Sequence, residues 1–346
     1  MSDGSRRTLT RRSLLGGAVV LAAAGVSVGI VESRKSAASS AAAVNRVANL
    51  TAGPVDASAV VFAPDGASLF GCAGTQIQQW DTASWQPGRL LTSPLAEVNG
   101  LAVNPGSTLL ACSADAVYVW NAKTGQQLKN LGETGDIANA TSLYTCLEFS
   151  ADGRLLAVGD QHGVIGLWNT STWALEGKLK GHSGAVNGVA FSPNGRTLMS
   201  GSQDTTARVW SLSSLQCTDV LQQTAAVSAV SFSSDGSTFT TAADNVVEFW
   251  NAATNRGIGT VGGFALSVSG TAFIPGSHVA VAADQNGDVK LCSQVAGSAQ
   301  TQWNTSGSIY GISVSSDGKL VAAAEQDGVV EVWSIEALRS ANAQAT

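Results

Sequence analysis

The chain has 346 residues, of which 44% are hydrophobic and 13% are charged, so it can bury a large core and does not have the composition of a disordered polypeptide. Its net charge is −6, and residues 44–346 hold 13 Lys and Arg against 23 Asp and Glu. A nucleic-acid binder needs a basic footprint, so we expect no nucleic-acid partner.

The first 43 residues have the order of a secretory signal. Four arginines within residues 6–12 precede the uncharged apolar run Leu14–Val31, and the Ser/Ala-rich stretch Ser36–Ala43 follows. The segment Thr10–Leu15 resembles a twin-arginine signal, although the Phe and Lys that usually follow the arginine pair are absent. We expect residues 1–43 to be a signal peptide or membrane anchor plus linker, and the protein to be exported or membrane-anchored, outside the cytoplasm.

Two fates of this segment remain open. Residues 41–43 are all Ala and offer a cleavage site, but Glu32, Arg34 and Lys35 separate them from the apolar run. That run has 18 residues, just enough to span a bilayer, so it could also remain as a single-span anchor from Leu14 to Val31. The positive charges would then hold the N-terminal end in the cytoplasm.

Beyond the linker, one strand ending recurs at intervals of 40 to 48 residues. It consists of Trp followed by a small polar residue or Asp, and Cys replaces Trp once. A fixed period of this size indicates an array of similar supersecondary units. The seven anchor positions are Trp80, Trp120, Trp168, Trp210, Trp250, Cys292 and Trp333.

The fourth repeat shows the unit most clearly. Apolar residues alternate with small or polar ones in residues 186–191 and 205–210, and further strands are expected at 196–201 and 216–221. A turn containing Gly separates the first two strands of every repeat, and a tight hairpin needs positive φ there. These glycines are Gly66, Gly106, Gly153, Gly195, Gly236, Gly276 and Gly318.

A four-stranded sheet of this size cannot bury both faces alone, but seven sheets can if they pack in a closed ring. With seven turns and seven anchors in one register, residues 45–336 resemble the WD-repeat β-propeller family. The expected fold is all-β: a seven-bladed β-propeller of four-stranded antiparallel blades over residues 44–336. A short apolar N-terminal helix or signal segment precedes it, and a polar tail, 337–346, follows. Residues 46–50 are expected to form a strand outside the seven repeats. The resemblance implies that this strand completes the seventh blade.

The resemblance also implies a hydrogen-bonded tetrad in each well-preserved blade. Only the fourth repeat has the whole set, which is His182, Ser200, Asp204 and Trp210. The fifth keeps Thr241, Asp244 and Trp250 with Gln223 in place of His, and the seventh keeps Asp327 and Trp333. A Ser, His and Asp could be read as catalytic. We favour a structural network that satisfies buried polar groups.

In this family, partners commonly bind where the first strands of the blades begin. Carried onto this chain, that rule gives the candidate partner-binding ring Ser58, Asn99, Thr145, Asn187, Ser228, Ser269 and Tyr310. The longest interval between anchors places extra residues at 132–144, with Glu133 and Asp136, as a further candidate or as simple length variation. Trp85 and Trp173 replace the usual Gly of another turn, where they could contact a ligand or pack over the neighbouring turn.

Other motifs do not indicate chemistry. Residues 257–262 spell a dinucleotide fingerprint but fall in a strand region with no helix after them. Residues 284–288 resemble the start of a calcium loop, yet Val295 stands where the bidentate acid belongs. The three His are too scattered for a zinc site, and the five Cys, which form no Cys-x-x-Cys pair, are expected to be small buried side chains. We therefore expect no cofactor, no metal and no catalytic residues.

These observations favour a monomeric, non-catalytic scaffold that binds a protein partner on the loop face of the propeller. A propeller that binds glycans of the cell envelope is the alternative, because small polar rims and spare tryptophans suit sugar stacking. A propeller-based enzyme is less favoured, since the expected cluster of His, Arg and acids cannot be assembled.

Overall fold

The computed structural model describes residues 46–94, 96–131, 143–294, 299–305 and 307–336, with only the backbone of 299–303. The proposed signal or anchor, the tail 337–346 and the candidates Glu133 and Asp136 lie outside the described residues. Within the described part of the chain, no helix is long and apolar enough to cross a membrane.

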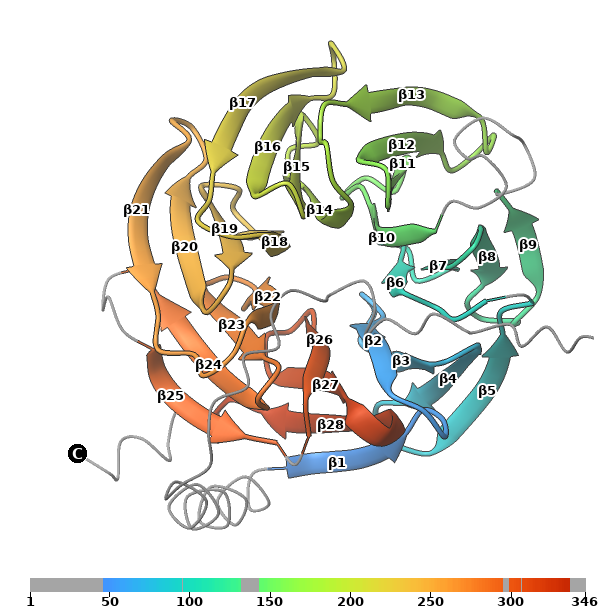
Figure 1. Ribbon diagram of the computed structural model, residues 1–346. Coiled ribbons are helices and arrows are strands. Elements are labelled where there is room, and N and C mark those ends of the chain that lie inside the picture. Colours follow the sequence, from blue (N-terminus) through green and yellow to red (C-terminus); the bar gives the residue numbers. More distant parts are fainter. Residues whose placement is uncertain (1–45, 95, 132–142, 295–298, 306, 337–346) are drawn as a thin grey trace, which may run out of the picture. The chain divides into compact units, whose positions relative to one another are not determined.

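The described chain forms seven four-stranded antiparallel sheets arranged in a ring (Figure 1). This confirms the predicted seven-bladed propeller. Blade 1 is β2 (Ala57–Phe62), β3 (Ser68–Ala73), β4 (Gln76–Asp81) and β5 (Pro87–Thr92). Blade 2 is β6 (Gly100–Val103), β7 (Leu109–Ser113), β8 (Val117–Asn121) and β9 (Gln127–Asn130). Blade 3 is β10 (Tyr144–Phe149), β11 (Leu155–Asp160), β12 (Val164–Asn169) and β13 (Leu175–Lys180).

The remaining blades follow the same meander. Blade 4 is β14 (Val186–Phe191), β15 (Thr197–Ser202), β16 (Thr206–Ser211) and β17 (Gln216–Gln222). Blade 5 is β18 (Val227–Phe232), β19 (Thr238–Ala243), β20 (Val246–Asn251) and β21 (Arg256–Val261). Blade 6 is β22 (Val268–Phe273), β23 (Val279–Asp284), β24 (Asp288–Ser293) and β25 (Ala299–Asn304). Blade 7 is β26 (Ile309–Val314), β27 (Leu320–Glu325) and β28 (Val329–Ser334), with a 3-10 turn, η2 (Gln326–Gly328), between the last two.

The outer strand of blade 7 comes from the other end of the sequence. Strand β1 (Arg46–Thr51) pairs antiparallel with β28, with Arg46 opposite Trp333 and Thr51 opposite Val329, and Figure 1 shows the two side by side. An ion pair between Arg46 and Glu331 joins the same two strands. The predicted closure of the ring by residues 46–50 is therefore confirmed.

Seven separate apolar clusters form the core, and each lies between two neighbouring blades. The Trp anchor of a blade packs into the cluster that it shares with the preceding blade. Trp210 thus joins side chains of blade 3, and Trp333 joins side chains of blade 6. Cys292 occupies the same position between blades 5 and 6, where Phe249 and Phe273 form an edge-to-face pair. Among the described side chains, no blade has an apolar cluster of its own, so each sheet depends on its neighbours for burial.

The turn between the first two strands follows the prediction in six blades but not in blade 2. Gly195 adopts a φ of 66°, and its N–H donates to the carbonyl of Ser192 at 2.9 Å. In blade 2 the positive φ falls on Ser107, at 52°, and Ser107 donates to Asn104 at 2.8 Å. The prediction for Gly106 was wrong by one residue, because Asn104 starts this turn and its side chain accepts from the N–H of Leu109 at 2.8 Å.

Candidate functional site

The predicted ring of partner-binding residues lies at a recurring irregularity of the inner strands. In six blades the pairing between the first and second strands shifts register at the ring residue. Ser58, for example, lies between the pairs Ala57–Ala73 and Ala59–Cys72. Such an extra residue redirects its side chain away from the ordinary pleat. All seven ring side chains are half-buried.

The ring side chains of the first five blades hydrogen-bond to the next blade. In the first five blades, each donates to the backbone carbonyl of the residue that precedes the ring residue in the following blade. Asn99 donates to Tyr144 at 2.9 Å, and Asn187 donates to Val227 at 2.9 Å. The other three donor–acceptor pairs are Ser58 to Val98, Thr145 to Val186 and Ser228 to Val268. We call these five contacts the inter-blade latches.

The latches do not continue around the whole ring. Ser269 of blade 6 donates to Ala283 of its own blade at 3.1 Å. In blade 7 the Tyr310 hydroxyl reaches the carboxylate of Asp56 at 3.2 Å, and the same carboxylate accepts from the N–H of Asp327 at 3.1 Å. The structure therefore places every ring residue in contacts within the protein, and their predicted role in partner binding stays a prediction.

The tetrad of blade 4 forms one connected network. His182 Nδ1 lies 2.9 Å from Asp204 Oδ2, and His182 Nε2 lies 2.7 Å from Ser200 Oγ. Trp210 Nε1 donates to the same Ser200 oxygen at 2.8 Å. Ser200 is 0% exposed, so no substrate can reach its hydroxyl. This geometry supports a structural role and not nucleophilic catalysis.

The electrostatics of the network agree with that role. Burial lowers the pKa of His182, and the hydrogen bond and charge of Asp204 only partly oppose this effect. Burial opposes the ionisation of Asp204, but hydrogen bonds from Thr206, Ser183 and His182 outweigh it and lower its pKa to about 2. At neutral pH the network therefore holds a neutral imidazole beside a carboxylate.

The degenerate tetrads keep only part of this arrangement. In blade 5, Trp250 Nε1 donates to Thr241 at 3.0 Å, and Thr241 contacts the Gln223 carbonyl oxygen at 3.3 Å. Asp244 instead accepts from Ser267 at 3.3 Å. Two residues separate β19 and β20, against three between β15 and β16, and this shorter turn places Asp244 at a φ of 52°. In blade 7, Asp327 has a φ of 61° within η2.

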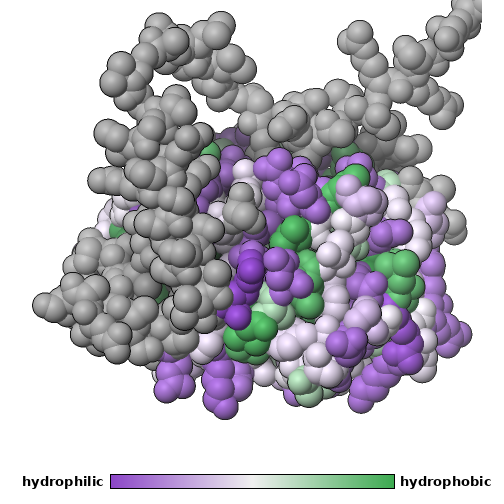
Figure 2. All heavy atoms as spheres, turned by 90° about the horizontal axis from the view of Figure 1, so that it is seen from below, coloured by the Kyte–Doolittle hydropathy of each residue, from purple (hydrophilic) through white to green (hydrophobic). Residues whose placement is uncertain are grey.

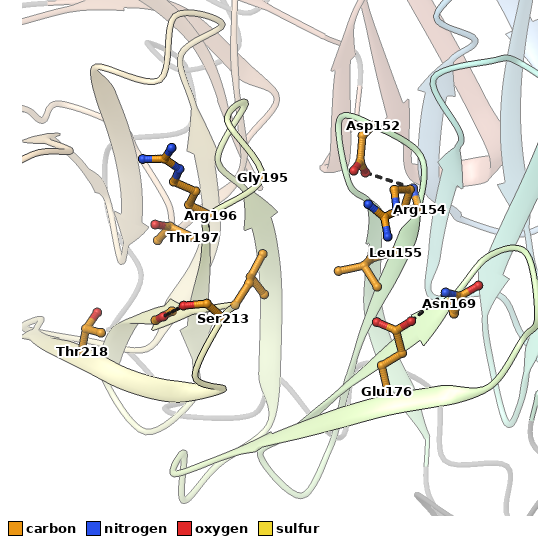
Figure 3. Close-up of a pocket in the computed structure, with 12 residues that line it drawn as sticks. Asp152, Arg154, Leu155, Asn169, Glu176, Gly195, Arg196, Thr197, Ser213 and Thr218 are labelled. Atoms are coloured by element: carbon orange, nitrogen blue, oxygen red, sulfur yellow. Dashed lines mark hydrogen bonds between the residues drawn. The ribbon is translucent and has the colours of Figure 1, made fainter.

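A groove of about 660 Å³ lies between blades 3 and 4. Figure 3 shows Asp152, Arg154 and Glu176 of blade 3 on one wall, with Arg196 and Ser213 of blade 4 on the other. The Arg154 guanidinium lies on the gap side of its wall, whereas the Arg196 side chain points away from Arg154. Neither arginine forms an ion pair with a described residue. Glu176 accepts from the Asn169 amide at 2.6 Å.

Sequence reasoning did not identify this groove. The available signal was that Arg154 and Arg196 each follow the turn glycine of adjacent repeats, which places them at equivalent positions of neighbouring blades. The sequence positions of these two arginines did not show that blades 3 and 4 leave a groove between them.

The structure also locates the other residues that the sequence singled out. Trp85 and Trp173 take positive φ, at 57° and 60°, and pack partly buried against the clusters between blades 7 and 1 and blades 2 and 3. Residues 257–261 lie within strand β21. Asp284 accepts the N–H groups of Asn286 and Asp288, both at 2.9 Å, as a turn residue does. All five Cys are free, and the described residues contain no group of metal-binding side chains.

Comparison with known proteins supports the same class. The WD40 family model (WD domain, G-beta repeat) matches residues 132–169, 173–211, 215–251 and 298–334. A p21-activated protein kinase-interacting protein 1-like protein of Gallus gallus is 25% identical over 279 residues, covering 78% of this chain and 70% of that protein. Its Xenopus laevis counterpart is 26% identical over 55% of this chain and 50% of its own length.

A third relative comes from a fungus. The target of rapamycin complex subunit wat1 of Schizosaccharomyces pombe is 26% identical over 46% of this chain and 51% of its own length. The chain is therefore a seven-bladed propeller in which four segments match the WD40 repeat model. Propellers of this family are in general non-catalytic scaffolds for protein interaction.

Proposed function

We propose that this protein is a non-catalytic scaffold, presented outside the cytoplasm, that binds a protein partner. The observation that carries the proposal is the groove between blades 3 and 4, in which Arg154 faces the gap without an ion-pair partner among the described residues. Arginine is enriched in protein interfaces and in their energetic hot spots.

The groove suits a polar extended segment of the partner. Its walls combine the positive charges of Arg154 and Arg196 with the carboxylates of Asp152 and Glu176, and blade 4 also contributes hydroxyls. Figure 2 shows apolar side chains on the described surface of one face as small groups among hydrophilic ones. The charged and hydroxyl groups that line the groove favour recognition by charge and hydrogen bonds.

The names of the relatives are consistent with binding of this kind. One is described as interacting with a p21-activated protein kinase, and another as a subunit of the target of rapamycin complex. The loop face on which the inner strands begin remains the second candidate surface. Its ring residues would have to exchange latch hydrogen bonds for partner contacts.

Cross-linking in cells that produce the full chain tests the proposal. We expect the wild type to capture the same protein partner reproducibly, and Arg154→Glu to lose it, since the substitution reverses the charge in the groove. Lys319→Glu is the matched control, because Lys319 follows the turn glycine of blade 7 as Arg154 follows that of blade 3. Capture of no protein, or equal loss in both variants, would argue against the groove as the binding site.

Presentation outside the cytoplasm is supported by the order of basic, apolar and small residues in the first 43 positions. Cell fractionation combined with sequencing of the N-terminus of the mature protein tests it. A mature chain that starts near residue 44 would support cleavage, an intact N-terminus in the membrane fraction would support the anchor, and an intact chain in the cytosol would refute export. The glycan alternative has weaker support, because Trp85 and Trp173 are packed against the blades.

A further inference from the structure

A second cavity, of about 430 Å³, lies along the inner strands of blades 3 to 6. Its lining mixes apolar and polar groups in similar proportion, with Phe149, Phe191 and Phe232 among the apolar side chains. Ser231 and Thr271 contribute hydroxyls, and Glu148 on β10 is the only ionisable residue among the described residues that line it. The volume falls within the range of about 300–1,000 Å³ that is usual for small-ligand pockets.

Glu148 differs from the residues at the equivalent positions of the other six inner strands. It lies three residues after the ring residue Thr145, and the equivalent positions of the other inner strands are all small or aliphatic. Those residues are Val61, Ala102, Ala190, Ser231, Ala272 and Ser313. The repeat pattern of the inner strands therefore does not account for the charge of Glu148.

The structural contact of Glu148 does not require a carboxylate. Its Oε2 accepts from the N–H of Phe191 in blade 4 at 2.7 Å. At the equivalent position of blade 7, the Ser313 hydroxyl accepts from the N–H of Phe62 in blade 1 at 3.1 Å. A serine thus makes the same bond between blades, and the second oxygen of Glu148 has no hydrogen-bond partner among the described residues.

We propose that this cavity binds an organic monocation, an alkylammonium or alkylguanidinium, whose charged end pairs with Glu148 and whose stem packs on the phenylalanines. A carboxylate held beside phenylalanine side chains loses part of its hydration, which is costly unless the carboxylate is neutralised or paired. Burial raises the pKa of Glu148 to about 8, so in the empty cavity it is mostly protonated at pH 7. A hard metal ion is a poor fit, because calcium and magnesium take six or more oxygen ligands, and the described residues hold no cluster of metal-binding side chains.

Cation binding therefore displaces a proton from Glu148. Few other groups near β10 titrate in the same range. Cys146 lies two residues earlier on the strand, and burial raises its pKa to about 12. On the strands packed against β10, the ionisable residues are Asp160 at the far end of β11 and Cys112 on β7, whose pKa burial raises well above the neutral range.

Calorimetric titration of the full chain with n-butylammonium at pH 7, in two buffers of different ionisation enthalpy, tests the proposal. We expect saturable binding with release of most of one proton per ligand, and weakening by at least about tenfold in Glu148→Gln. The Gln variant keeps an acceptor for Phe191, so it should fold. Glu97→Gln, which removes an exposed carboxylate that lines neither this cavity nor the groove, should bind as the wild type does.

A neutral ligand and a peptide complete the design. Pentanol, which has a similar stem without the charge, should bind far more weakly than n-butylammonium. The blocked tripeptide acetyl-Ala-Lys-Ala-amide tests whether the cation comes from a protein side chain. If it does, the tripeptide should bind more tightly than n-butylammonium. If the ligand is a small metabolite, the tripeptide should bind more weakly. The proposal would be overturned if no saturable heat were seen, if binding released no proton, or if Glu148→Gln bound with equal affinity. The test needs no protein partner, so it stands apart from the proposed scaffold role.

Discussion

The side-chain amide of Asn187 in blade 4 donates a 2.9 Å hydrogen bond to the backbone carbonyl of Val227 in blade 5. Each of the five inter-blade latches repeats this relationship, and each ties the ring side chain of one blade to the start of the inner strand of the next. The polar ring therefore links neighbouring blades at the inner edge, where their apolar clusters end.

The latches should contribute measurably to stability. Asn187→Ala removes one bond and leaves a carbonyl between blades without its partner, so we expect the free energy of unfolding to fall by about 1 kcal/mol. Urea unfolding followed by tryptophan fluorescence measures this. Ser228→Ala should have a similar effect, and an unchanged urea midpoint in both variants would show that the latches are energetically neutral.

The tetrad of blade 4 should behave as one unit. His182→Ala removes one hydrogen-bond partner each from Ser200 and Asp204, and we expect a loss of about 2 kcal/mol. Trp210→Phe removes the indole donor to the same Ser200 oxygen. Because both changes disrupt one network, the double variant should lose less than the sum of the single losses, and strict additivity in urea unfolding would contradict the coupling.

The same network predicts sensitivity to acid. The pKa of His182 and that of Asp204 are both lowered by folding, so both groups bind protons more readily in the unfolded chain. Their contribution to stability is present above the ordinary histidine pKa and is lost in two steps as pH falls, first for His182 and then toward about 2 for Asp204. His182→Gln should remove the first step, and melting curves between pH 4 and 7 would reveal it.

Glu325, which is fully buried in blade 7, predicts the opposite pH dependence. Burial, with the nearby charge of Glu331, raises its pKa to about 9. The folded state therefore keeps a proton that the unfolded chain releases near 4.5, the ordinary value. Stability should fall as pH rises between these values, by up to about 1.4 kcal/mol per pH unit.

Glu325→Gln should therefore stabilise the protein at neutral and alkaline pH and flatten the profile. Glu336→Gln, which changes a carboxylate that follows the last strand, is the control. A melting temperature that drops in Glu325→Gln at pH 8 would mean that the buried carboxyl makes contacts an amide cannot replace.

Removal of residues 44–52 should open the ring. The outer edge of β28 would lose its partner strand, together with the ion pair from Arg46, and an unpaired edge is a template for aggregation. We expect self-association in size-exclusion chromatography and early proteolysis within blade 7. Arg46→Ala alone should leave the ring closed, and a monomeric, protease-resistant deletion variant would refute the role of β1.

Much of the fold could be predicted because it repeats in the sequence. The anchor positions and turns gave the number of blades, and the stray strand at residues 46–50 gave the closure. The turn of blade 2 was misplaced because Pro105-Gly106 resembles a turn centre, while Asn104 sets the register one residue later. A glycine alone does not show which turn position it occupies.

The candidate sites were harder to predict, because they depend on contacts between repeats. The sequence located the polar ring but did not show that its side chains bond to the next blade. Likewise, Glu148 is an ordinary residue within its own strand, and it stands out only when the inner strands of four blades surround one cavity. Repeat analysis compares equivalent positions, whereas these sites arise where neighbouring blades differ.

The pairing of Arg46 with Trp333 has a consequence for biosynthesis. The earliest strand of the propeller to leave the ribosome must stay unpaired until nearly 290 further residues have been translated, because its partner is the last strand made. Contacts between such distant segments form slowly. A nascent chain stalled before residue 329 would therefore expose two sheet edges at once, which gives a chaperone a defined interval in which to protect them.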